Sequence, residues 1–365
     1  MDYRILHLIM SLAPGGAEKQ MTYLARALHD RGVDVHVGYF GDGPNRSLLE
    51  ERGVPLHRLP LRGSYDPRAP FQLHRLIRRL APDLVETWIP AVDVTGGLAA
   101  RASGKPWILS ERNAPDWFPD SAKFRLRRWL ARGASAVISN SRAGDAYWEE
   151  QLGSRVPRYV IRNALPEELV RGDLPPIHDD FGFDPQRPLV LYAGRLIAQK
   201  NVPVTLRALE QVVRETDAVA LVAGIGPEQE YVRTFIREHG LEDRMVAPGF
   251  LPSIWSWMRR ATVFVSVSHH EGMPNTVAEV AALGTPLVIS KIPQHTDLLP
   301  DECAVYTGTD DPREVAAAIR SVLDDPVAAR ARAEKARAVS RGWTIGRAAD
   351  RYAEVYEQVL AGVRR

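Results

Sequence analysis

The chain has a single cysteine, Cys303, among its 365 residues. A lone cysteine cannot form an intrachain disulfide, so the sequence is not that of a disulfide-built secreted scaffold, and a reducing compartment is expected. An excess of charge of one sign is missing as well, because 47 Lys and Arg stand against 45 Asp and Glu. The formal net charge of +2 gives no overall reason to expect nucleic acid as a partner.

Long apolar runs are also absent. A membrane-spanning helix needs about 20 apolar residues, and no window of the chain supplies that many without charges. The apolar start at Ile5–Met10 runs into a turn and lacks a small-residue cleavage site placed as in a signal peptide. We therefore expect a cytoplasmic globular protein whose first strand is this segment, which agrees with 45% hydrophobic and 25% charged residues.

Apolar strand-like runs alternate with helical patterns along most of the chain. In the first half, strands are expected at Arg4–Ser11, Asp34–Phe40, Leu84–Thr87, Trp107–Ser110, Ala136–Ser139 and Tyr159–Arg162. In the second half, they are expected at Leu189–Ala193, Ala218–Ala223, Arg244–Ala247, Thr262–Ser268 and Pro286–Ser290. The principal helices are expected at Glu18–Arg31, Asn201–Glu215, Glu228–His239, Thr276–Leu283, Pro312–Leu323 and Thr344–Val363. Strands separated by helices indicate the α/β class, with parallel sheets covered on both faces.

Five prolines interrupt this alternation between Asn163 and Pro188. Because proline opposes the continuation of helices and sheets, an interdomain linker is predicted there. The predicted segments are an N-terminal Rossmann-like, acceptor-binding domain (1–170), a linker (171–187), a C-terminal Rossmann-like donor domain (188–342) and a terminal helix that returns to the first domain (343–365). Two such domains are expected to face a central cleft at the carboxyl ends of their strands, where ligands of this architecture bind.

Two cations lie close together after the first strand of the second half. Arg195 follows that strand beside a glycine, and Lys200 precedes the next helix. Cationic side chains near a glycine suit a diphosphate, because they neutralise its charge while the glycine leaves room. Gly226, after the next strand, is a weaker signal, since such turns are common.

The segment from His269 to Glu279 is the most informative in the chain. Glu271 lies in a loop after a strand, and Glu279 lies eight positions later in the following helix. Asn275 is predicted to cap that helix, with the N–H groups of the first turn directed into the cleft. Carboxylates that only accept hydrogen bonds could each hold two vicinal hydroxyls, as on a ribose or a hexose, although each could also be an ordinary surface charge. Together with the cations, the pair indicates a nucleotide-sugar.

A Gly15-Gly16 pair precedes the first helix of the chain. Adjacent glycines let the backbone approach a ligand, and the helix offers free N–H groups to an anion, but an ordinary tight turn would use the same residues. The spacing is not that of the dinucleotide fingerprint, which argues against a dehydrogenase.

In this order, the motifs resemble those of the retaining glycosyltransferases of family 4, which have the two-domain GT-B fold. The resemblance implies transfer of a hexose or N-acetylhexosamine, with retained configuration, from a nucleoside-diphosphate sugar to a hydroxyl of a glycan or lipid-linked glycan. A UDP-sugar is favoured over a GDP-sugar. By resemblance, Arg195 and Lys200 bind the diphosphate, Glu279 binds the ribose, Phe250 lies near the base, and Glu271 contacts the donor hexose; Arg195, Lys200 and Glu271 are the catalytic candidates. The implied donor-binding residues are Gly15, Gly16, Arg195, Lys200, Gly226, Phe250, Glu271, Gly272, Met273, Pro274, Asn275, Thr276 and Glu279.

The sequence departs from the family where many members carry a histidine near the donor sugar. Here the segment reads Ser110-Glu111-Arg112-Asn113, so a histidine-dependent mechanism is not carried over. Arg112 is either a contact to a departing phosphate or anionic acceptor, or a structural ion-pair partner. Arg112, Asn113 and His270 are the candidates for contacts with the donor sugar or the acceptor.

No Asp-x-Asp occurs in the chain, so neither a metal nor any cofactor beyond the nucleotide-sugar co-substrate is expected. A sugar-nucleotide epimerase or a glycosyl phosphorylase on the same fold is the alternative function. A sugar-binding module without turnover is the second alternative.

The segment Lys123–Arg132 combines cations with large apolar residues and has no acid. At helical spacing, Leu126, Trp129 and Leu130 are expected on one face and three arginines on another. This pattern suits a peripheral enzyme on the anionic inner face of a membrane. The alternative is a surface helix whose apolar residues pack inward.

Overall fold

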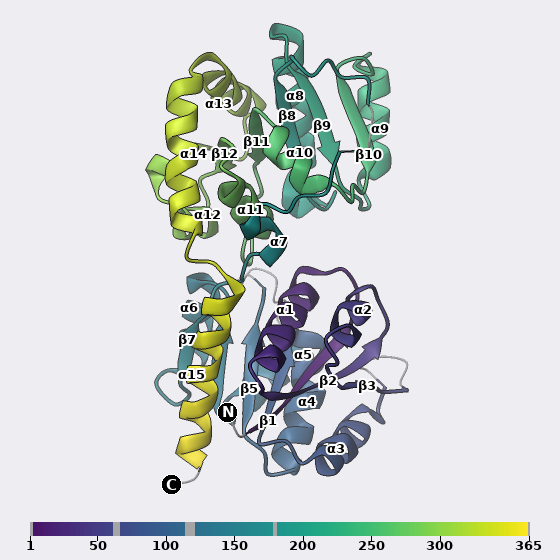
Figure 1. Ribbon diagram of the computed structural model, residues 1–365, viewed down its shortest axis with the longest axis vertical. Helices are drawn as coiled ribbons and strands as arrows, with labels where there is room; N and C mark the ends of the chain where they lie inside the picture. The colour runs from purple at the N-terminus through teal and green to yellow at the C-terminus, as the bar shows by residue number, and fades with distance from the viewer. Residues whose placement is uncertain (1–2, 61–65, 114–120, 178–180, 364–365) are drawn as a thin grey trace. The chain divides into compact units, whose positions relative to one another are not determined.

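The computed structural model describes residues 3–60, 66–113, 121–177 and 181–363. The chain divides into two compact units (Figure 1). Unit 1 comprises Met1–Ala164 and Trp343–Arg365, and unit 2 comprises Leu165–Gly342. The terminal segment therefore belongs to the same unit as the first half of the chain.

Unit 1 is built on a parallel sheet that, in its described residues, has seven strands in the order β3-β2-β1-β4-β5-β6-β7. The strands are β1 (Arg4–Ser11), β2 (Asp34–Gly41), β3 (Leu56–Arg58), β4 (Leu84–Trp88), β5 (Trp107–Glu111), β6 (Ala136–Ser139) and β7 (Arg158–Val160). The helices are α1 (Gly16–Asp30), α2 (Asn45–Glu50), α3 (Ala69–Leu80), α4 (Pro90–Ala102), α5 (Ala122–Ala131), α6 (Arg142–Leu152) and α15 (Ile345–Val363).

The unit 1 sheet is buried on both faces. One apolar cluster joins the sheet to α1 and α15, and another joins it to α3, α4, α5 and α6. Every residue of β4, β5 and β6 is buried. Such double burial explains why these strands are mostly apolar in the sequence, although Glu86 and Glu111 are buried with them.

Unit 2 repeats the architecture with a parallel sheet that, over its described residues, has the order β10-β9-β8-β11-β12-β13. The strands are β8 (Leu189–Ala193), β9 (Val219–Ala223), β10 (Met245–Gly249), β11 (Val263–Ser266), β12 (Leu287–Ser290) and β13 (Val305–Thr307). The helices are α7 (Glu167–Arg171), η2 (Ala198–Lys200), α8 (Val202–Glu215), α9 (Gln229–Glu238), α10 (Ile254–Arg260), α11 (Asn275–Leu283), α12 (Pro293–Leu298), η3 (Asp301–Cys303), α13 (Pro312–Asp324) and α14 (Pro326–Ser340). The predicted α/β class, with two Rossmann-like sheets, is confirmed.

Several helices begin where a short polar side chain accepts a backbone N–H. Asp311 accepts from Arg313 at the start of α13, and Asp325 accepts from Ala328 at the start of α14. The predicted cap at Asn275 is wrong, because Pro274 occupies the cap position and Asn275 is the first residue of α11. The chain already turns before the helix, since the Asn275 N–H donates to the Met273 carbonyl at 2.9 Å.

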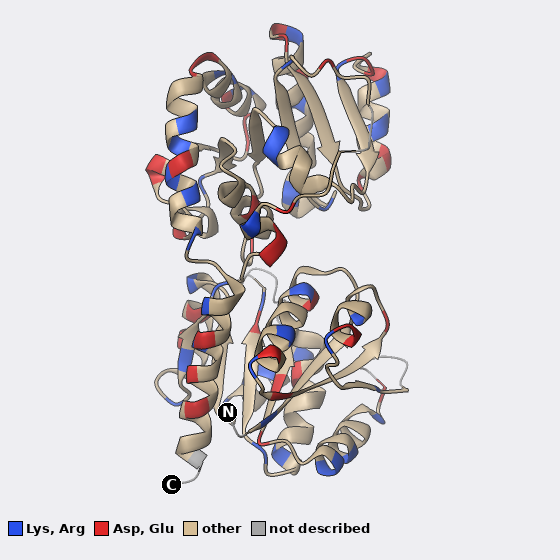
Figure 2. Cartoon of the chain, in the orientation of Figure 1, with Lys and Arg blue, Asp and Glu red and all other residues tan. Residues whose placement is uncertain are grey.

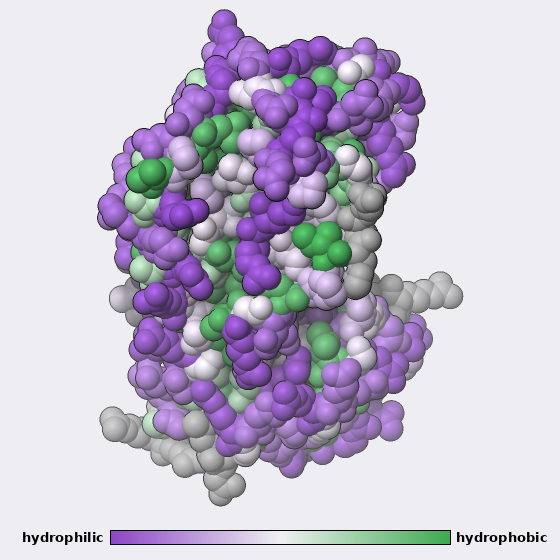
Figure 3. Space-filling view, turned by 45° about the horizontal axis from the view of Figure 1, so that its top comes forward, coloured by the Kyte–Doolittle hydropathy of each residue, from purple (hydrophilic) through white to green (hydrophobic). Residues whose placement is uncertain are grey.

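The sequence pattern does not predict the short elements at the sheet edges and in the proline-rich stretch. The edge strands β3 and β13 have three residues each, too few for a periodicity to register. Within the proline-rich stretch lies the one-turn helix α7, which ends at Gly172 with a φ of 81°. Figure 3 shows that hydrophilic residues cover most of the visible surface, with hydrophobic residues in small separate patches.

Candidate functional site

The loops that follow β8 and β11 in unit 2 are bound to each other. The His269 N–H donates to the Gln199 carbonyl at 3.0 Å, and the Gln199 side-chain amide donates to the His270 carbonyl at 2.8 Å. Because β8 and β11 are neighbouring parallel strands, both loops leave the same edge of the sheet. The fold thus joins two motifs that lie some 70 residues apart in the sequence.

Lys200 and Glu271 form an ion pair at this junction. Lys200 Nζ lies 2.5 Å from Glu271 Oε1, and the two side chains are only 14% and 7% exposed. Burial alone would raise the pKa of Glu271, but the charge and the hydrogen bond of Lys200 outweigh it and hold that pKa below its ordinary value. Glu271 is therefore a fixed carboxylate, and Lys200 has a partner before any ligand is bound.

Arg195 lies in the same loop but is exposed. Its backbone carbonyl accepts a hydrogen bond from the Tyr192 hydroxyl at 3.1 Å, which fixes the loop beneath it. No hydrogen bond or ion pair involves its guanidinium in the described part of the chain. A cation presented on a fixed backbone is suited to an anionic ligand.

Gly226 and its neighbour Gly224 have a packing role that explains their presence. A Cβ at Gly224 would lie 1.8 Å from the Gly194 carbonyl oxygen, and one at Gly226 would lie 2.3 Å from the Leu196 carbonyl oxygen. Both contacts are with backbone, which cannot move aside as a side chain would. These glycines let the loops after β8 and β9 lie against each other, and this need is independent of a ligand.

Two further predicted residues lie around the same edge of the sheet. Glu279, on α11, accepts a hydrogen bond from the Trp255 indole at 3.1 Å and remains half-buried. Phe250 follows β10 and is 68% exposed, an unusual position for a large aromatic side chain. Between them, Gly272, Met273 and Pro274 form the turn into α11, and Thr276 lies in its first turn.

His295, at the start of α12, was not predicted. Its ring is fully buried, and its Nδ1 lies 2.8 Å from the Ser290 carbonyl, which can only accept, so Nδ1 carries the proton. Burial lowers the pKa of His295 to about 4, and the charges of Glu271 and Lys200 act on it as well. A neutral histidine therefore lies near the ion pair. No sequence motif indicates His295, because only the order of the strands in the sheet brings it near Glu271.

His270, by contrast, was a candidate from the sequence. Its carbonyl is used in joining the two loops, and its Nδ1 is buried without a hydrogen-bond partner among the described residues. The backbone of His270 is therefore in direct contact with the Lys200 loop.

Gly15 and Gly16 lie in unit 1, at the start of α1. Gly15 occupies the cap position with an extended backbone, and no side chain caps the helix. Glu18 lies in the first turn, and burial raises its pKa. The start of α1 is therefore without a side-chain cap, and the Glu18 carboxyl group lies close to Gly15.

Arg112 is held in the interior of unit 1. Its guanidinium carbon lies 4.1 Å from the centre of the Trp88 ring, and its nitrogens donate to Asn163 and Ser110 at 3.3 Å and to the Tyr352 hydroxyl. Of the two roles considered for Arg112, these contacts favour the structural one, which joins β4 and β5 to α15. Asn113 lies beside it, with its N–H donating to Glu111 at 3.0 Å.

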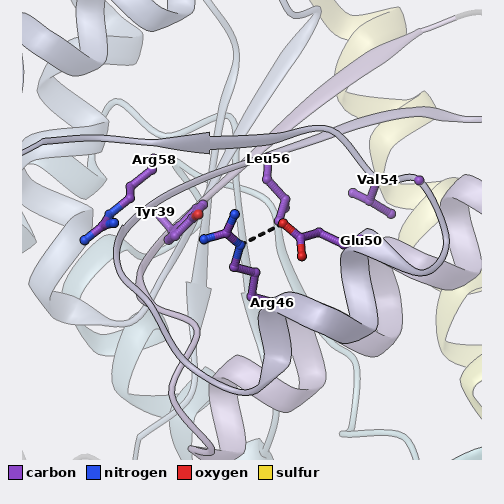
Figure 4. Close-up of a pocket in the computed structure, with 7 residues that line it drawn as sticks. Tyr39, Arg46, Glu50, Val54, Leu56 and Arg58 are labelled. Atoms are coloured by element: carbon purple, nitrogen blue, oxygen red, sulfur yellow. Dashed lines mark hydrogen bonds and ion pairs between the residues drawn. The ribbon is translucent and has the colours of Figure 1, made fainter.

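Unit 1 also contains a polar pocket that the sequence did not indicate (Figure 4). It has a volume of about 570 Å³ and lies among β2, β3 and α2. Arg46 Nε lies 2.7 Å from Glu50 Oε1, and Arg58 lies 3.0 Å from Asp42. The lining residues are Tyr39, Arg46, Glu50, Gly53, Val54, Leu56 and Arg58.

Comparison with known proteins identifies the chain. The family described as "Glycosyltransferase Family 4" matches residues 14–169, and that described as "Glycosyl transferases group 1" matches residues 175–339. The two matches follow each other along the chain, one for most of the first half and one for most of the second. The chain belongs to glycosyltransferase family 4. It is an enzyme, a glycosyltransferase with the GT-B fold, as the sequence motifs predicted.

Named relatives of the glycosyltransferase include a mannosyltransferase and a glycogen synthase. The chain is 29% identical over 249 residues to the lipopolysaccharide core biosynthesis mannosyltransferase LpcC of Rhizobium leguminosarum bv. viciae, a match that covers 65% of this chain and 68% of the relative. It is 31% identical over 222 residues to glycogen synthase of Mycobacterium tuberculosis, covering 58% of this chain but only about half, 51%, of that relative. Among solved structures, Anabaena Alr3699/HepE in complex with UDP matches with a TM-score of 0.82 at 24% identity, over 97% of this chain and all of that one.

In the described residues of the glycosyltransferase, no group of three or more His, Cys, Asp or Glu side chains is arranged to hold a metal ion. None of the helices described is long and apolar enough to span a membrane.

Proposed function

We propose that the protein transfers a hexose or N-acetylhexosamine from a UDP-sugar to a hydroxyl of a glycan or lipid-linked glycan, with retained configuration and without a metal. The observation that carries the proposal is the arrangement of Arg195, Lys200 and Glu271 at the carboxyl edge of the unit 2 sheet. It places one exposed cation, one paired cation and one fixed carboxylate within two joined loops.

The donor diphosphate is assigned to Arg195 and Lys200. Arg195 is the exposed cation, whereas Lys200 would share its charge between Glu271 and the phosphate. A carboxylate that stays ionised accepts hydrogen bonds only, so Glu271 would hold hydroxyls of the transferred sugar. Glu279 would hold the ribose hydroxyls, and the exposed Phe250 offers a ring face for the base.

UDP is favoured as the nucleotide because Alr3699/HepE was crystallised with UDP and with UDP-glucose. A GDP-sugar is the second option, since a mannosyltransferase is among the relatives. Retention follows if the acceptor hydroxyl attacks on the face of the leaving group and the departing phosphate takes its proton. Such a step relies on positioning and on the cations rather than on a titrating base.

The acceptor is assigned to unit 1, where the pocket of Figure 4 lies. Each of its two arginines is paired with a carboxylate, Arg46 with Glu50 in the lining and Arg58 with Asp42 beside it, so hydrogen-bond donors and acceptors stand side by side. That combination suits the hydroxyl groups of a neutral sugar better than an anion. A lipid-carried acceptor would be met at the inner face of a membrane, from the cytoplasmic side.

The test combines a binding measurement with a product analysis. Thermal unfolding is followed with UDP, GDP, ADP and CMP, and UDP is expected to stabilise the protein most. UDP-sugars are then incubated with and without glycan acceptors, and NMR of the product is expected to show the anomeric configuration of the donor. Isomerised donor without acceptor would indicate an epimerase, phosphate-dependent release of sugar a phosphorylase, and binding without turnover a sugar-binding module; each would overturn the proposal.

A further inference from the structure

Three neighbouring helices, α3, α4 and α5, lie on the side of the unit 1 sheet that α6 also covers. α3 packs against α4, and α4 packs against α5. The apolar cluster beneath them contains buried side chains of all three helices: Leu73 and Ile77 of α3, Val92 and Ala99 of α4, and Leu130 of α5. Since the inner sides of the helices face the same sheet, their outer sides face the solvent together.

Large apolar side chains are concentrated on those outer sides. Phe71 is 66% exposed, Leu98 37%, Leu126 40% and Trp129 56%. Among the described residues of unit 1, every exposed large apolar side chain lies on α3, α4 or α5. The prediction that Leu130 would share a face with Leu126 and Trp129 is wrong, because Leu130 is buried at 1% exposure.

These three helices have exposed cations and no exposed acid. They contain one acidic residue, Asp93, which is fully buried and lies 2.7 Å from Arg127. Arg127 is itself buried, so it does not add to the surface charge as the sequence pattern had indicated. The exposed cations are Arg75, Arg78 and Arg79 on α3, Arg101 on α4, and Arg125 on α5, with Arg132 directly after it. Figure 2 shows α3 with blue segments and no red ones.

Apolar and cationic groups are also interleaved across the helices. The Arg101 guanidinium lies 5.8 Å from the centre of the Trp129 ring, so a cation of α4 covers an aromatic side chain of α5. Long basic side chains of this kind can extend to phosphate groups while aromatic rings enter the boundary of the acyl chains.

We propose that the outer sides of α3, α4 and α5 dock on the surface of an anionic lipid bilayer. This extends the proposed function by naming where a lipid-carried acceptor is met. A second copy of the chain is a poorer occupant, because like charges would face each other. RNA is a poorer occupant too, because Phe71, Leu98, Leu126 and Trp129 would bury no apolar surface against phosphate groups.

Vesicle co-sedimentation of the full chain tests the membrane proposal without measuring sugar transfer. The membrane proposal and the proposed function can therefore fail separately. Phosphatidylcholine vesicles with and without phosphatidylglycerol are compared at low and high salt. The protein is expected to bind only the anionic vesicles and to be released by salt. The triple variant Arg75→Glu, Arg78→Glu, Arg79→Glu is expected to bind at least a hundredfold more weakly, since each basic side chain contributes about fivefold.

A second variant examines the apolar part, and two matched variants serve as controls. Phe71→Ser with Trp129→Ser is expected to weaken binding about tenfold or more while leaving its salt dependence unchanged. The charge control is Arg330→Glu, Lys335→Glu, Arg341→Glu, and the apolar control is Val327→Ser with Val339→Ser, all on exposed positions in and beside α14. Both controls are expected to bind as the native protein does.

Thermal unfolding verifies that each variant is folded. Equal binding to neutral vesicles, no binding to anionic ones, retention of a polyuridylate RNA in place of vesicles, or equal losses in the α14 controls would each overturn the proposal.

Discussion

Lys200 Nζ lies 2.5 Å from Glu271 Oε1, although the two residues are 71 positions apart in the chain. The pair closes the contact between the loops after β8 and β11, where hydrogen bonds of Gln199 already connect them. The contribution of this pair to stability can be measured without any ligand, because removing the charge of one partner changes the pKa of the other.

Lys200→Met leaves the buried Glu271 carboxylate without its partner. The free energy of unfolding at neutral pH is expected to fall by roughly 3 kcal/mol. In the native protein the pKa of Glu271 is lowered, so the pair stabilises above the ordinary carboxyl pKa and this stabilisation is lost as the pH falls through the range below it. In the variant, burial alone raises the pKa of Glu271. The dependence of stability on pH therefore reverses, and protonation of the carboxyl group at lower pH is expected to raise the free energy of unfolding.

Urea unfolding between neutral pH and about pH 4 measures both effects. The double variant Lys200→Met, Glu271→Gln carries neither charge and serves as the control, without the reversed dependence. An acid slope of Lys200→Met equal to that of the native protein would contradict the assignment.

Glu279 and Arg195 are expected to differ in which kinetic constant they affect. Ribose contacts are alike in the ground and transition states, so Glu279→Ala should raise the KM for the donor about tenfold to a hundredfold with kcat nearly unchanged. Diphosphate charge grows as the glycosidic bond breaks, so Arg195→Ala should lower kcat by about a hundredfold.

Steady-state kinetics with varied donor separate the two effects. Arg233→Ala, an exposed arginine on α9, is the matched control for the loss of a surface cation. Donor kinetics unchanged in Glu279→Ala and Arg195→Ala would remove both residues from the site.

Transfer is expected to continue in excess EDTA. The cations Arg195 and Lys200 would take the place that a divalent metal has in other sugar transferases, by balancing the charge of the leaving diphosphate. Initial rates with EDTA, magnesium and manganese are compared after removal of metals from all solutions. Loss of activity in EDTA that magnesium or manganese restores would show that a metal takes part.

The regions that could be predicted from the sequence are those whose pattern repeats over several residues. The predicted residues form β1, β6 and β8, because buried parallel strands are mostly apolar over several successive residues. The amphipathic helices α8 and α13 agree within a residue at each end. Edge strands such as β3 and β13 could not be predicted, because three residues carry no periodicity.

Pairings between side chains could not be predicted in the same way. The sequence placed Arg195, Lys200 and Glu271 at strand ends, but it did not indicate that Lys200 binds Glu271 or that His295 lies near them. Nor did it indicate that Arg127 is buried within a basic helix. These relations depend on strand order and on which side of a helix meets the sheet, and both are settled only by tertiary packing.

Arg112 is expected to contribute to stability rather than to turnover. Arg112→Ala removes the contacts with Trp88 and Tyr352 that join β4 to α15. In a double-mutant cycle with Tyr352→Phe, the free energy of unfolding should show a coupling of about 0.5–3 kcal/mol, while kcat of the folded protein stays unchanged. The opposite pattern, a large loss of kcat with native stability, would assign Arg112 to the ligand instead.

Asp93 should make the stability of unit 1 depend on pH. Its carboxylate accepts from Thr87 at 2.6 Å and from Arg127 at 2.7 Å, but burial, with a further contribution from the charge of Glu111, raises the pKa of Asp93 to about 6. A pKa raised in the folded state adds stability below the ordinary aspartate value, and this is lost as the pH rises through about 6. The free energy of unfolding should therefore fall between about pH 4 and pH 6.5, and Asp93→Asn, of the same shape but unable to titrate, should lack this fall. Urea unfolding at several pH values measures both proteins, and parallel curves would mean that Asp93 keeps its ordinary ionisation inside the fold.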